Sequence, residues 1–264
     1  MNFAIYQASR IGGRKYNQDR VAHAYTDQAL LLVMADGMGG HLHGETAAQI
    51  AVETFMHSFC QSARPCLAQP EEFLHVTMRR AHEAIMQYAH DQMLGGYPGT
   101  TCVAALVQDG RVCWTHAGDS RLYLLRDNKV AAVTHDHSVV QQWADRGFIS
   151  AADMKTHPSR NKITNCLGGM ADLFYDEAAP AVLLQTGDVL LLCSDGLCGP
   201  LPDAEIASAF GIAQSLPETL ECLLDKALMR AGERADNTTA VAARWGCAED
   251  VQPAPVPVCR ILDC

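Results

Sequence analysis

Two mostly apolar runs in this chain each end in the dipeptide Asp-Gly. Residues 30–35 lead to Asp36, and residues 189–194 lead to Asp195. Short continuous apolar runs are typical of buried strands, and the glycine that follows allows a sharp turn. A carboxylate at the end of a buried strand is costly to desolvate unless a positive charge meets it. The two aspartates therefore predict strands that converge on a shared cation.

Two further aspartates stand at the edges of predicted strands. Asp119 lies in the segment Ala-Gly-Asp-Ser-Arg, and Asp236 lies just before the apolar segment 238–245. Mg²⁺ and Mn²⁺ prefer oxygen ligands and retain several waters, so a few carboxylates are enough to bind them. The four aspartates therefore predict a site for hard divalent metals. Simple turn-forming roles for Asp119 and Asp236 are the alternative, and they stay open here.

The composition argues against several classes of function. The 264 residues include 20 Lys and Arg against 30 Asp and Glu, for a formal charge of −10. Affinity for a phosphate backbone or an anionic membrane needs Lys and Arg, so we expect no nucleic-acid or membrane partner. We see no signal peptide and no run long enough to span a bilayer. The 11 cysteines lack any Cys-x-x-Cys pair, which favours a reducing cytoplasm over a disulfide framework or zinc ribbon.

Hydrophobic periodicity predicts strands interrupted by two groups of helices. We expect helices where apolar residues recur every three or four positions, and strands where they alternate or run together. The expected strands cover residues 2–9, 19–35, 100–107, 111–117, 121–126, 188–194 and 238–245, and the expected helices cover 45–59, 71–94, 137–147, 150–156 and 214–231. This order predicts an α+β fold of two sheets with helices packed outside them.

The chain is expected to form one domain followed by a short tail. Its 264 residues suit one large domain or two small ones, and residues 1–246 contain all the predicted elements. Residues 247–264 contain Pro253, Pro255 and Pro257, and we expect them to form a flexible tail.

Eight short motifs occur in the order found in one known family. They are Arg14-x-x-Asn17-Gln18-Asp19, Asp36-Gly37-Met38-Gly39-Gly40-His41, Gly44-Glu45, Gly99-Thr100-Thr101, Ala117-Gly118-Asp119-Ser120-Arg121, Asp136-His137-Ser138, Ser194-Asp195-Gly196 and Asp236-Asn237-x-Thr239. Each motif is weak alone, because Asp-Gly is a common turn dipeptide. In this order, the chain resembles the bacterial form of the metal-dependent protein phosphatases of type 2C. The resemblance implies a β-sandwich of two antiparallel sheets flanked by helix pairs.

The resemblance also implies a set of metal ligands. Two ions are implied, either Mn²⁺ or Mg²⁺, and a third ion is expected beside them. Asp36 would bridge the first two ions, and the carbonyl oxygen of Gly37 would bind one of them. Asp195 and Asp236 would complete the first site, and Asp19 would support the second. Asp119 with Asp195 would hold the third ion.

The implied activity is hydrolysis of phosphoserine and phosphothreonine in proteins by a metal-bridging hydroxide. A pair of divalent ions acidifies a bridging water and holds phosphate oxygens for in-line attack. Arg14 would bind two phosphate oxygens through its planar guanidinium, which a lysine could not match. The expected substrates are phosphoproteins, made by a cognate bacterial Ser/Thr kinase, and we expect the phosphatase to be a monomer.

The donor of the proton to the leaving group is left open by the sequence. Met38 stands where animal members of the family carry a histidine proposed as the general acid. His41 and His137 have a suitable side-chain chemistry, although a lone histidine is more often a structural hydrogen-bonding residue. A metal-bound water is the third candidate.

Two other functions were weighed against the phosphatase. A scaffold that binds phosphoproteins without hydrolysing them would keep the fold and lose ligands, yet all five aspartates and Arg14 are present. A nucleotide-binding kinase is suggested by residues 37–40, but the Gly-Lys-Ser/Thr phosphate loop and the kinase catalytic-loop signature are missing. The phosphatase is the preferred interpretation.

Overall fold

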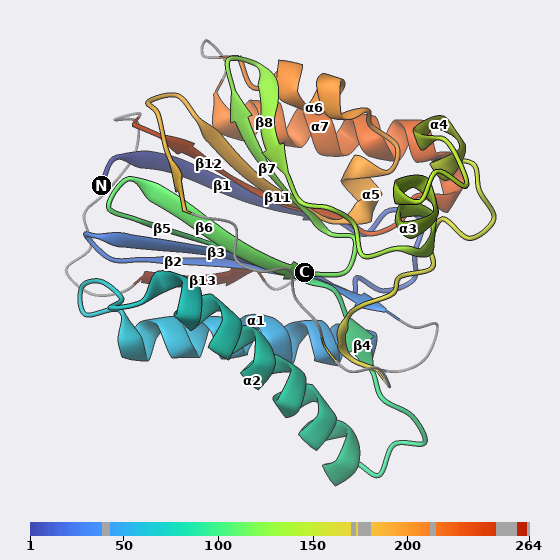
Figure 1. The fold of residues 1–264 in the computed structure, drawn as a ribbon, viewed down its shortest axis with the longest axis horizontal. Helices are drawn as coiled ribbons and strands as arrows, with labels where there is room; N and C mark the ends of the chain where they lie inside the picture. The colour runs from blue at the N-terminus through green and yellow to red at the C-terminus, as the bar shows by residue number, and fades with distance from the viewer. Residues whose placement is uncertain (39–42, 170–172, 174–180, 212–214, 247–257, 263–264) are drawn as a thin grey trace.

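The computed structural model describes residues 1–38, 43–169, 173, 181–211, 215–246 and 258–262. Its centre is a sandwich of two antiparallel sheets with helices on both outer faces (Figure 1). In spatial order, the first sheet contains β1 (Phe3–Arg10), β12 (Thr238–Trp245), β11 (Val189–Cys193), β7 (Arg121–Arg126) and β8 (Lys129–Val133). The second contains β10 (Val182–Leu183), β6 (Arg111–Ala117), β5 (Cys102–Gln108), β3 (Ala29–Met38), β2 (Asp19–Tyr25) and β13 (Val258–Leu262), with β4 (Gly99–Thr100) and β9 (Leu167–Gly168) attached beside β3. The predicted fold class is confirmed.

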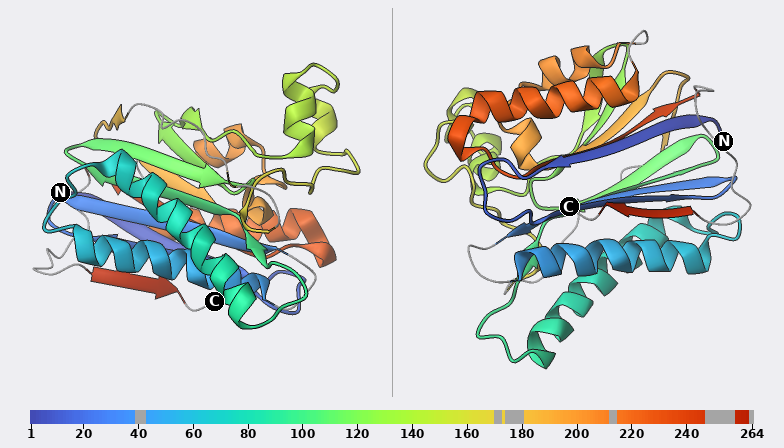
Figure 2. Two further views of the ribbon diagram at one scale, coloured as in Figure 1. Left: turned by 60° about the horizontal axis from the view of Figure 1, so that its bottom comes forward. Right: turned by 180° about the vertical axis from the view of Figure 1, so that it is seen from behind.

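Helices cover the two outer faces of the sandwich, as the two views of Figure 2 show. The second sheet is covered by α1 (Gly44–Ser62) and α2 (Pro70–Asp91). The first sheet is covered by α5 (Asp195–Cys198), α6 (Asp203–Ala209) and α7 (Leu216–Ala231), which a short 3₁₀ helix, η1 (Gly232–Arg234), follows. Two short helices, α3 (Val139–Asp145) and α4 (Ala151–Met154), lie together at one end (Figure 1).

The core consists of three apolar layers, and β3 contributes to two of them. Leu31 and Val33 face α1 and α2, whereas Leu30 and Leu32 face the opposite sheet. The third layer lies between the first sheet and α5, α6 and α7. A strand that is buried on both faces reads as a continuous apolar run rather than an alternating one. This burial explains the run that ends at Asp36.

Several elements of the fold were not predicted from the sequence, namely β8, α6, β13 and the short elements β9, β10, α5 and η1. Strand β8 alternates between exposed and partly buried residues, so it lacks the apolar run of a core strand. Helix α6 is only seven residues long, and its apolar face contributes Ile206 and Ala207 to the core. Strand β13 pairs antiparallel with β2.

Strand β13 lies within the predicted tail. Val258–Leu262 pair with β2 instead of forming a free segment, and residues 247–257 lie outside the described part of the chain. The domain boundary at residue 246 stays a prediction.

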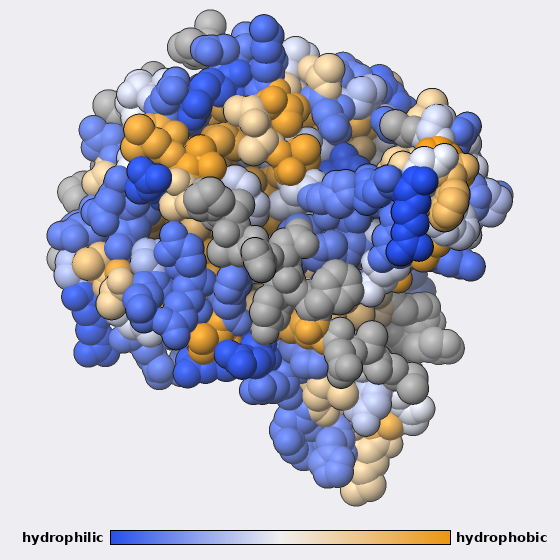
Figure 3. Space-filling view, in the orientation of Figure 1, coloured by the Kyte–Doolittle hydropathy of each residue, from blue (hydrophilic) through white to orange (hydrophobic). Residues whose placement is uncertain are grey.

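The described surface and cysteines bear on where the protein works. No helix in the described ranges is both long and apolar enough to cross a membrane. Most of the face in Figure 3 is hydrophilic, and an apolar area lies over the part of the sandwich that carries β7 and β8.

Seven described cysteines are free thiols, but Cys60 forms a disulfide, which the sequence analysis did not predict. The cytoplasmic location stays a prediction.

Candidate active site

Strands from both sheets bring the predicted aspartates together at one end of the sandwich. Asp19 begins β2 and lies directly opposite Asp36 of β3 in the antiparallel register. Asp119 follows β6, Asp195 begins α5 directly after β11, and Asp236 precedes β12. The side chain of Asp19 is buried, whereas the other four aspartates are partly exposed. Five carboxylates from distant parts of the sequence therefore share one site.

The carboxylates raise one another's pKa values. Burial is the main cause for Asp36, and the charges of Asp19, Asp195 and Asp119 raise its pKa further. Burial also raises the pKa of Asp195, with Asp119 and Asp236 adding to the effect. Burial raises the pKa of Asp19 to about 6 and that of Asp119 to about 6. Such shifts mean that the charged forms lack sufficient positive partners within the protein.

The oxygen atoms of this cluster fit hard divalent cations. Asp19 Oδ2 accepts a hydrogen bond from Ser194 Oγ at 2.9 Å, whereas the buried Asp19 Oδ1 has no partner among the described residues. Within those residues, no three Asp, Glu, His or Cys side chains are grouped to hold an ion unaided. Mg²⁺ and Mn²⁺ keep several waters and bind through one or two carboxylates. The cluster therefore suits these ions better than a metal that needs an all-protein cage.

Two threonines fix the backbone of Asp36. The amide of Thr101 donates to the Asp36 carbonyl oxygen at 2.8 Å, and the Thr100 hydroxyl donates to the same oxygen at 2.9 Å. The amide of Asp36 donates in turn to Thr101 Oγ1 at 3.0 Å. The Gly-Thr-Thr motif thus has a structural role in holding Asp36.

The two Asp-Gly glycines are needed because backbone atoms pack directly against them. A Cβ atom on Gly37 would lie 2.3 Å from the carbonyl oxygen of Gly44. A Cβ atom on Gly196 would lie 2.0 Å from the carbonyl oxygen of Asn237. Neither contact is possible for a larger residue without backbone movement. The glycines therefore allow the segments that carry the aspartates to approach one another.

Arg14 lies over the carboxylate cluster from an exposed loop. Its Nη2 atom donates to Asp236 Oδ2 at 2.5 Å, and 56% of its side chain is exposed. The hydrogen bond that Arg14 donates to Asp236 raises the pKa of Arg14, and the charges of Asp195 and Asp36 add to this shift. The arginine is therefore held beside the cluster while more than half of its side chain stays accessible.

Asn237 holds the Arg14 loop in place, a role that the sequence analysis did not assign. Its Nδ2 atom donates to the carbonyl oxygens of Ile11 at 2.9 Å and Tyr16 at 3.0 Å, and its Oδ1 atom accepts from the amide of Gln18 at 2.9 Å. The only sequence signal was its place in the Asp-Asn-x-Thr motif. Contacts across more than two hundred residues could not be read from that motif.

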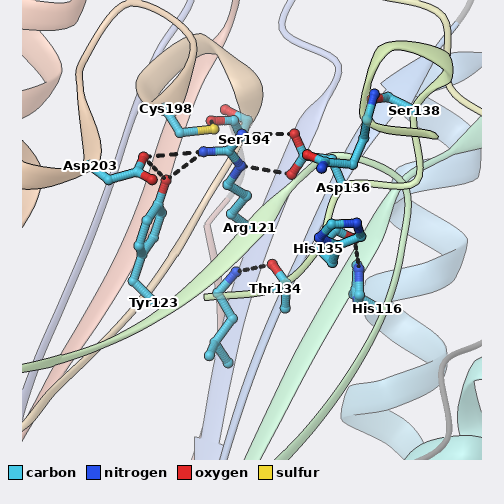
Figure 4. Close-up of polar contacts among 12 residues, drawn as sticks. His116, Arg121, Tyr123, Thr134, His135, Asp136, Ser138, Ser194, Cys198 and Asp203 are labelled. Carbon is cyan, nitrogen blue, oxygen red and sulfur yellow. Dashed lines mark hydrogen bonds and ion pairs between the residues drawn. The ribbon is translucent and has the colours of Figure 1, made fainter. Parts of the chain in front are cut away.

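Arg121 links two motifs that the sequence analysis treated separately (Figure 4). Its guanidinium donates to both carboxylate oxygens of Asp136, at 2.7 and 2.8 Å. It also donates to Asp203 Oδ1 at 3.2 Å, and Tyr123 Oη donates to the same oxygen at 3.0 Å. A paired arginine fork gives defined geometry as well as charge neutralisation. Arg121 thus fixes the start of α6 and the segment before α3 beside Asp119.

Of the two histidines predicted as candidate proton donors, only His137 lies among the described residues. His41 lies outside the described residues. His137 is 7% exposed, and its ring stacks on His116 with a centroid distance of 4.3 Å. Its Nδ1 atom accepts from the amide of Gly118 at 3.3 Å. This environment favours a structural role for His137.

An open groove of about 660 Å³ lies over the cluster. Its lining includes Asp119, Asp195 and Asp236 of the cluster, together with Arg14. One side is formed by the segment that follows α4, and the opposite side by α5, α7 and η1. The groove therefore leaves these carboxylates accessible from solvent.

Comparison with known proteins places these features in a family. Residues 6–231 match the sequence profile described as Protein phosphatase 2C. The serine/threonine phosphatase stp of Listeria innocua is 34% identical over 238 residues, which cover 89% of this chain and 93% of that protein. The structure of the phosphatase Stp1 from Staphylococcus aureus superposes with a TM-score of 0.84 at 28% identity, covering 94% of this chain and 96% of that one.

One similar structure contains metal ions. The catalytic domain of the serine/threonine phosphatase PstP, in complex with two manganese ions, superposes with a TM-score of 0.75 at 30% identity. The match covers 92% of this chain and 97% of that one. The likeness therefore extends over most of the chain.

Proposed function

Because the chain belongs to the protein phosphatase 2C family, we propose that it is a metal-dependent phosphatase of phosphoserine and phosphothreonine in proteins. The observation that carries this proposal is the convergence of five aspartates beneath an accessible Arg14. Relatives named serine/threonine phosphatases are 33–36% identical to the chain. A phosphoprotein-binding scaffold without activity is disfavoured, since such a scaffold has no need of a strained carboxylate cluster.

The aspartates are proposed to hold two divalent ions, Mn²⁺ or Mg²⁺, and a third ion beside them. When bound, such ions acidify a water and neutralise the charge on a phosphate group. Asp36 and the carbonyl oxygen of Gly37 would hold the pair, together with Asp19, Asp195 and Asp236, whereas Asp119 and Asp195 would hold the third ion.

Arg14 is proposed to bind the phosphate group of the substrate. One of its nitrogen atoms contacts Asp236, which orients the planar fork over the cluster and leaves its remaining donors accessible. A guanidinium binds two phosphate oxygens with fixed geometry.

The groove also contains Cys198, but a hydrogen bond with Cys193 and burial raise the pKa of its thiol. Cys198 therefore stays protonated and is unsuited to attack phosphorus.

The proposed function is tested with a phosphothreonine peptide and p-nitrophenyl phosphate. We expect both to be hydrolysed in Mn²⁺, and we expect a metal chelator to abolish the activity and added Mn²⁺ to restore it. Tight peptide binding without release of phosphate, at any Mn²⁺ or Mg²⁺ concentration, would support the scaffold instead.

Replacing Arg14 with alanine is expected to raise KM for the phosphopeptide by about tenfold or more, because the substrate loses a charge-assisted, two-point contact. Mn²⁺ affinity, measured by calorimetry, should not weaken, since Arg14 contacts Asp236 without being a ligand. Arg14→Lys is the matched control: it keeps the charge, loses the fork, and should give an intermediate KM. A large loss of Mn²⁺ affinity in Arg14→Ala would contradict this role.

Replacing Asp119 with asparagine separates the metal role from the turn role. A turn residue should change stability by about 1 kcal/mol or less and leave turnover unchanged. A ligand to a third ion should lower turnover and shift the Mn²⁺ concentration that gives half-maximal activity. We expect the second result, because Asp119 contributes to the raised pKa values of both Asp36 and Asp195. Identical Mn²⁺ titrations for variant and parent would establish the turn role.

The biological setting follows from the same proposal. The expected substrates are phosphoproteins made by a cognate Ser/Thr kinase in the cytoplasm, and the phosphatase is proposed to act as a monomer. A purified kinase from the same cell, used to phosphorylate candidate proteins, would supply the physiological substrates for the assay.

A further inference from the structure

Cationic side chains are concentrated around the groove. The chain has 20 Lys and Arg against 30 Asp and Glu, yet six of its cationic side chains border this one groove. They are Arg14, Arg121, Lys155, Arg160, Arg230 and Arg234. Five aspartates also line the groove, yet only three of the six cations pair with carboxylates among the described residues, so the groove keeps unmatched cationic side chains that favour an anionic ligand.

Three of these cations already have partners in the protein. Arg14 contacts Asp236 at 2.5 Å, and Arg121 forms its fork with Asp136. Arg230 contacts Glu205 at 2.9 Å. These arginines shape the groove or bind the phosphate, so they are not available for a second anionic group.

The other three cations are available. The side chains of Lys155, Arg160 and Arg234 are exposed, and none of them makes an ion pair or hydrogen bond within the described part of the chain. Lys155 and Arg160 border the groove from the segment after α4, whereas Arg234 ends η1 on the opposite side. A ligand lying across the carboxylate cluster would therefore pass between cations on both sides.

The position of Arg234 determines which residues of a bound peptide could contact its side chain. Arg234 precedes Asp236 by two residues, so their Cα atoms lie within about 7.6 Å of each other. An extended peptide advances about 3.3 Å per residue. A peptide whose phosphorylated residue lies over Asp236 would therefore place residues two or three positions away beside Arg234.

Resting on the proposed phosphatase function, we propose that Arg234, together with Lys155 and Arg160, selects substrates with Asp or Glu within about three residues of the phosphorylated side chain. A single exposed ion pair contributes little, and salt screens it. The attractions of the three cations for acidic residues of the peptide add to one another. The preference for acidic peptides is therefore expected to appear as a lower KM and to decline as ionic strength rises.

The test compares three phosphothreonine peptides of equal length that carry Asp, Ala or Lys at positions two and three on both sides. We expect kcat/KM in Mn²⁺ at low salt to be about three- to tenfold higher for the Asp peptide than for the Ala peptide, with the Lys peptide lowest. The difference should come from KM and should shrink as salt is added.

Variants assign the preference to residues. Arg234→Ala should reduce the ratio of kcat/KM for the Asp peptide to that for the Ala peptide by about threefold, and Arg234→Lys should restore most of it. Arg230→Ala is the matched control, because Arg230 borders the same groove but is engaged by Glu205. It should leave that ratio unchanged, as should Arg79→Ala on α2.

The outcomes distinguish this proposal from the function on which it rests. Equal kcat/KM for the three peptides would overturn the proposal and leave the phosphatase function intact. The same ratio in Arg234→Ala as in the parent would overturn the role of Arg234. Failure to hydrolyse any of the peptides in Mn²⁺ would overturn both the specificity and the phosphatase function.

Discussion

Asp36→Asn is expected to lose nearly all phosphatase activity while the fold stays intact. Asp36 interacts with four other carboxylates of the cluster, and its backbone is fixed by Thr100 and Thr101. Asparagine keeps the size and the backbone contacts but cannot supply a charged bridge between ions. Activity above about a tenth of the parent value in saturating Mn²⁺ would overturn the assignment. Asp225→Asn, on the exposed face of α7, is the matched control and should be fully active.

The same variant should raise the stability of the metal-free protein at neutral pH. Burial and neighbouring carboxylates raise the pKa of Asp36 above its ordinary value of 3.8. The folded metal-free protein therefore retains a proton that the unfolded chain releases, and stability falls as pH rises above about 4. Asparagine removes this contribution. We expect a higher melting temperature for the variant at pH 7, with the difference shrinking towards pH 4.

Gly196→Ala is expected to cause the second largest effect, through both stability and activity. The added methyl group would lie 2.0 Å from the carbonyl oxygen of Asn237, so α5 and the start of β12 must separate. Forcing extra volume into a packed site costs roughly 1–3 kcal/mol, and each kcal/mol lowers the melting temperature by about 2–4 °C in a domain of this size. The separation also moves Asp195 away from Asp236, so Mn²⁺ affinity should fall.

The control for this variant is a glycine in open space. Gly96→Ala adds the same methyl group where no atom lies within 4 Å, and its backbone φ is not positive. It should leave the melting temperature and the Mn²⁺ titration unchanged. If Gly196→Ala behaves like Gly96→Ala in calorimetry, the two segments are not packed as tightly as the structure places them.

The sequence predicts the aspartates well because each of them lies in or next to a buried strand, close to its end. Asp36 and Asp195 end apolar runs, and such runs are local signals that need no knowledge of distant contacts. The convergence of four of the aspartates was inferred from the cost of burying charge, Asp19 was added by the family resemblance, and the structure brings all five aspartates together. The roles of these residues as ligands stay proposals.

The contacts that the sequence could not predict join distant segments. The fork between Arg121 and Asp136 crosses fifteen positions, and the contacts of Asn237 with the Arg14 loop cross more than two hundred. Neither has a local pattern, because an exposed arginine and a paired one look the same in a sequence. Strand β8 was missed for a related reason, since half-exposed edge strands lack a strong apolar pattern.

The two sheets of the sandwich each carry part of the carboxylate cluster. Asp19 and Asp36 belong to strands of one sheet, Asp195 and Asp236 adjoin strands of the other, and Asp119 lies in the turn that connects β6 of the former to β7 of the latter. The gap between the sheets is filled by side chains such as Leu32 and Leu192. The thickness of that interior therefore sets the separation of the two halves of the site. A substitution that leaves a cavity there, or that adds an oversized side chain, would change the separation of the carboxylates on the two sheets. Changes in the core and changes in metal affinity are therefore expected to be coupled in this fold.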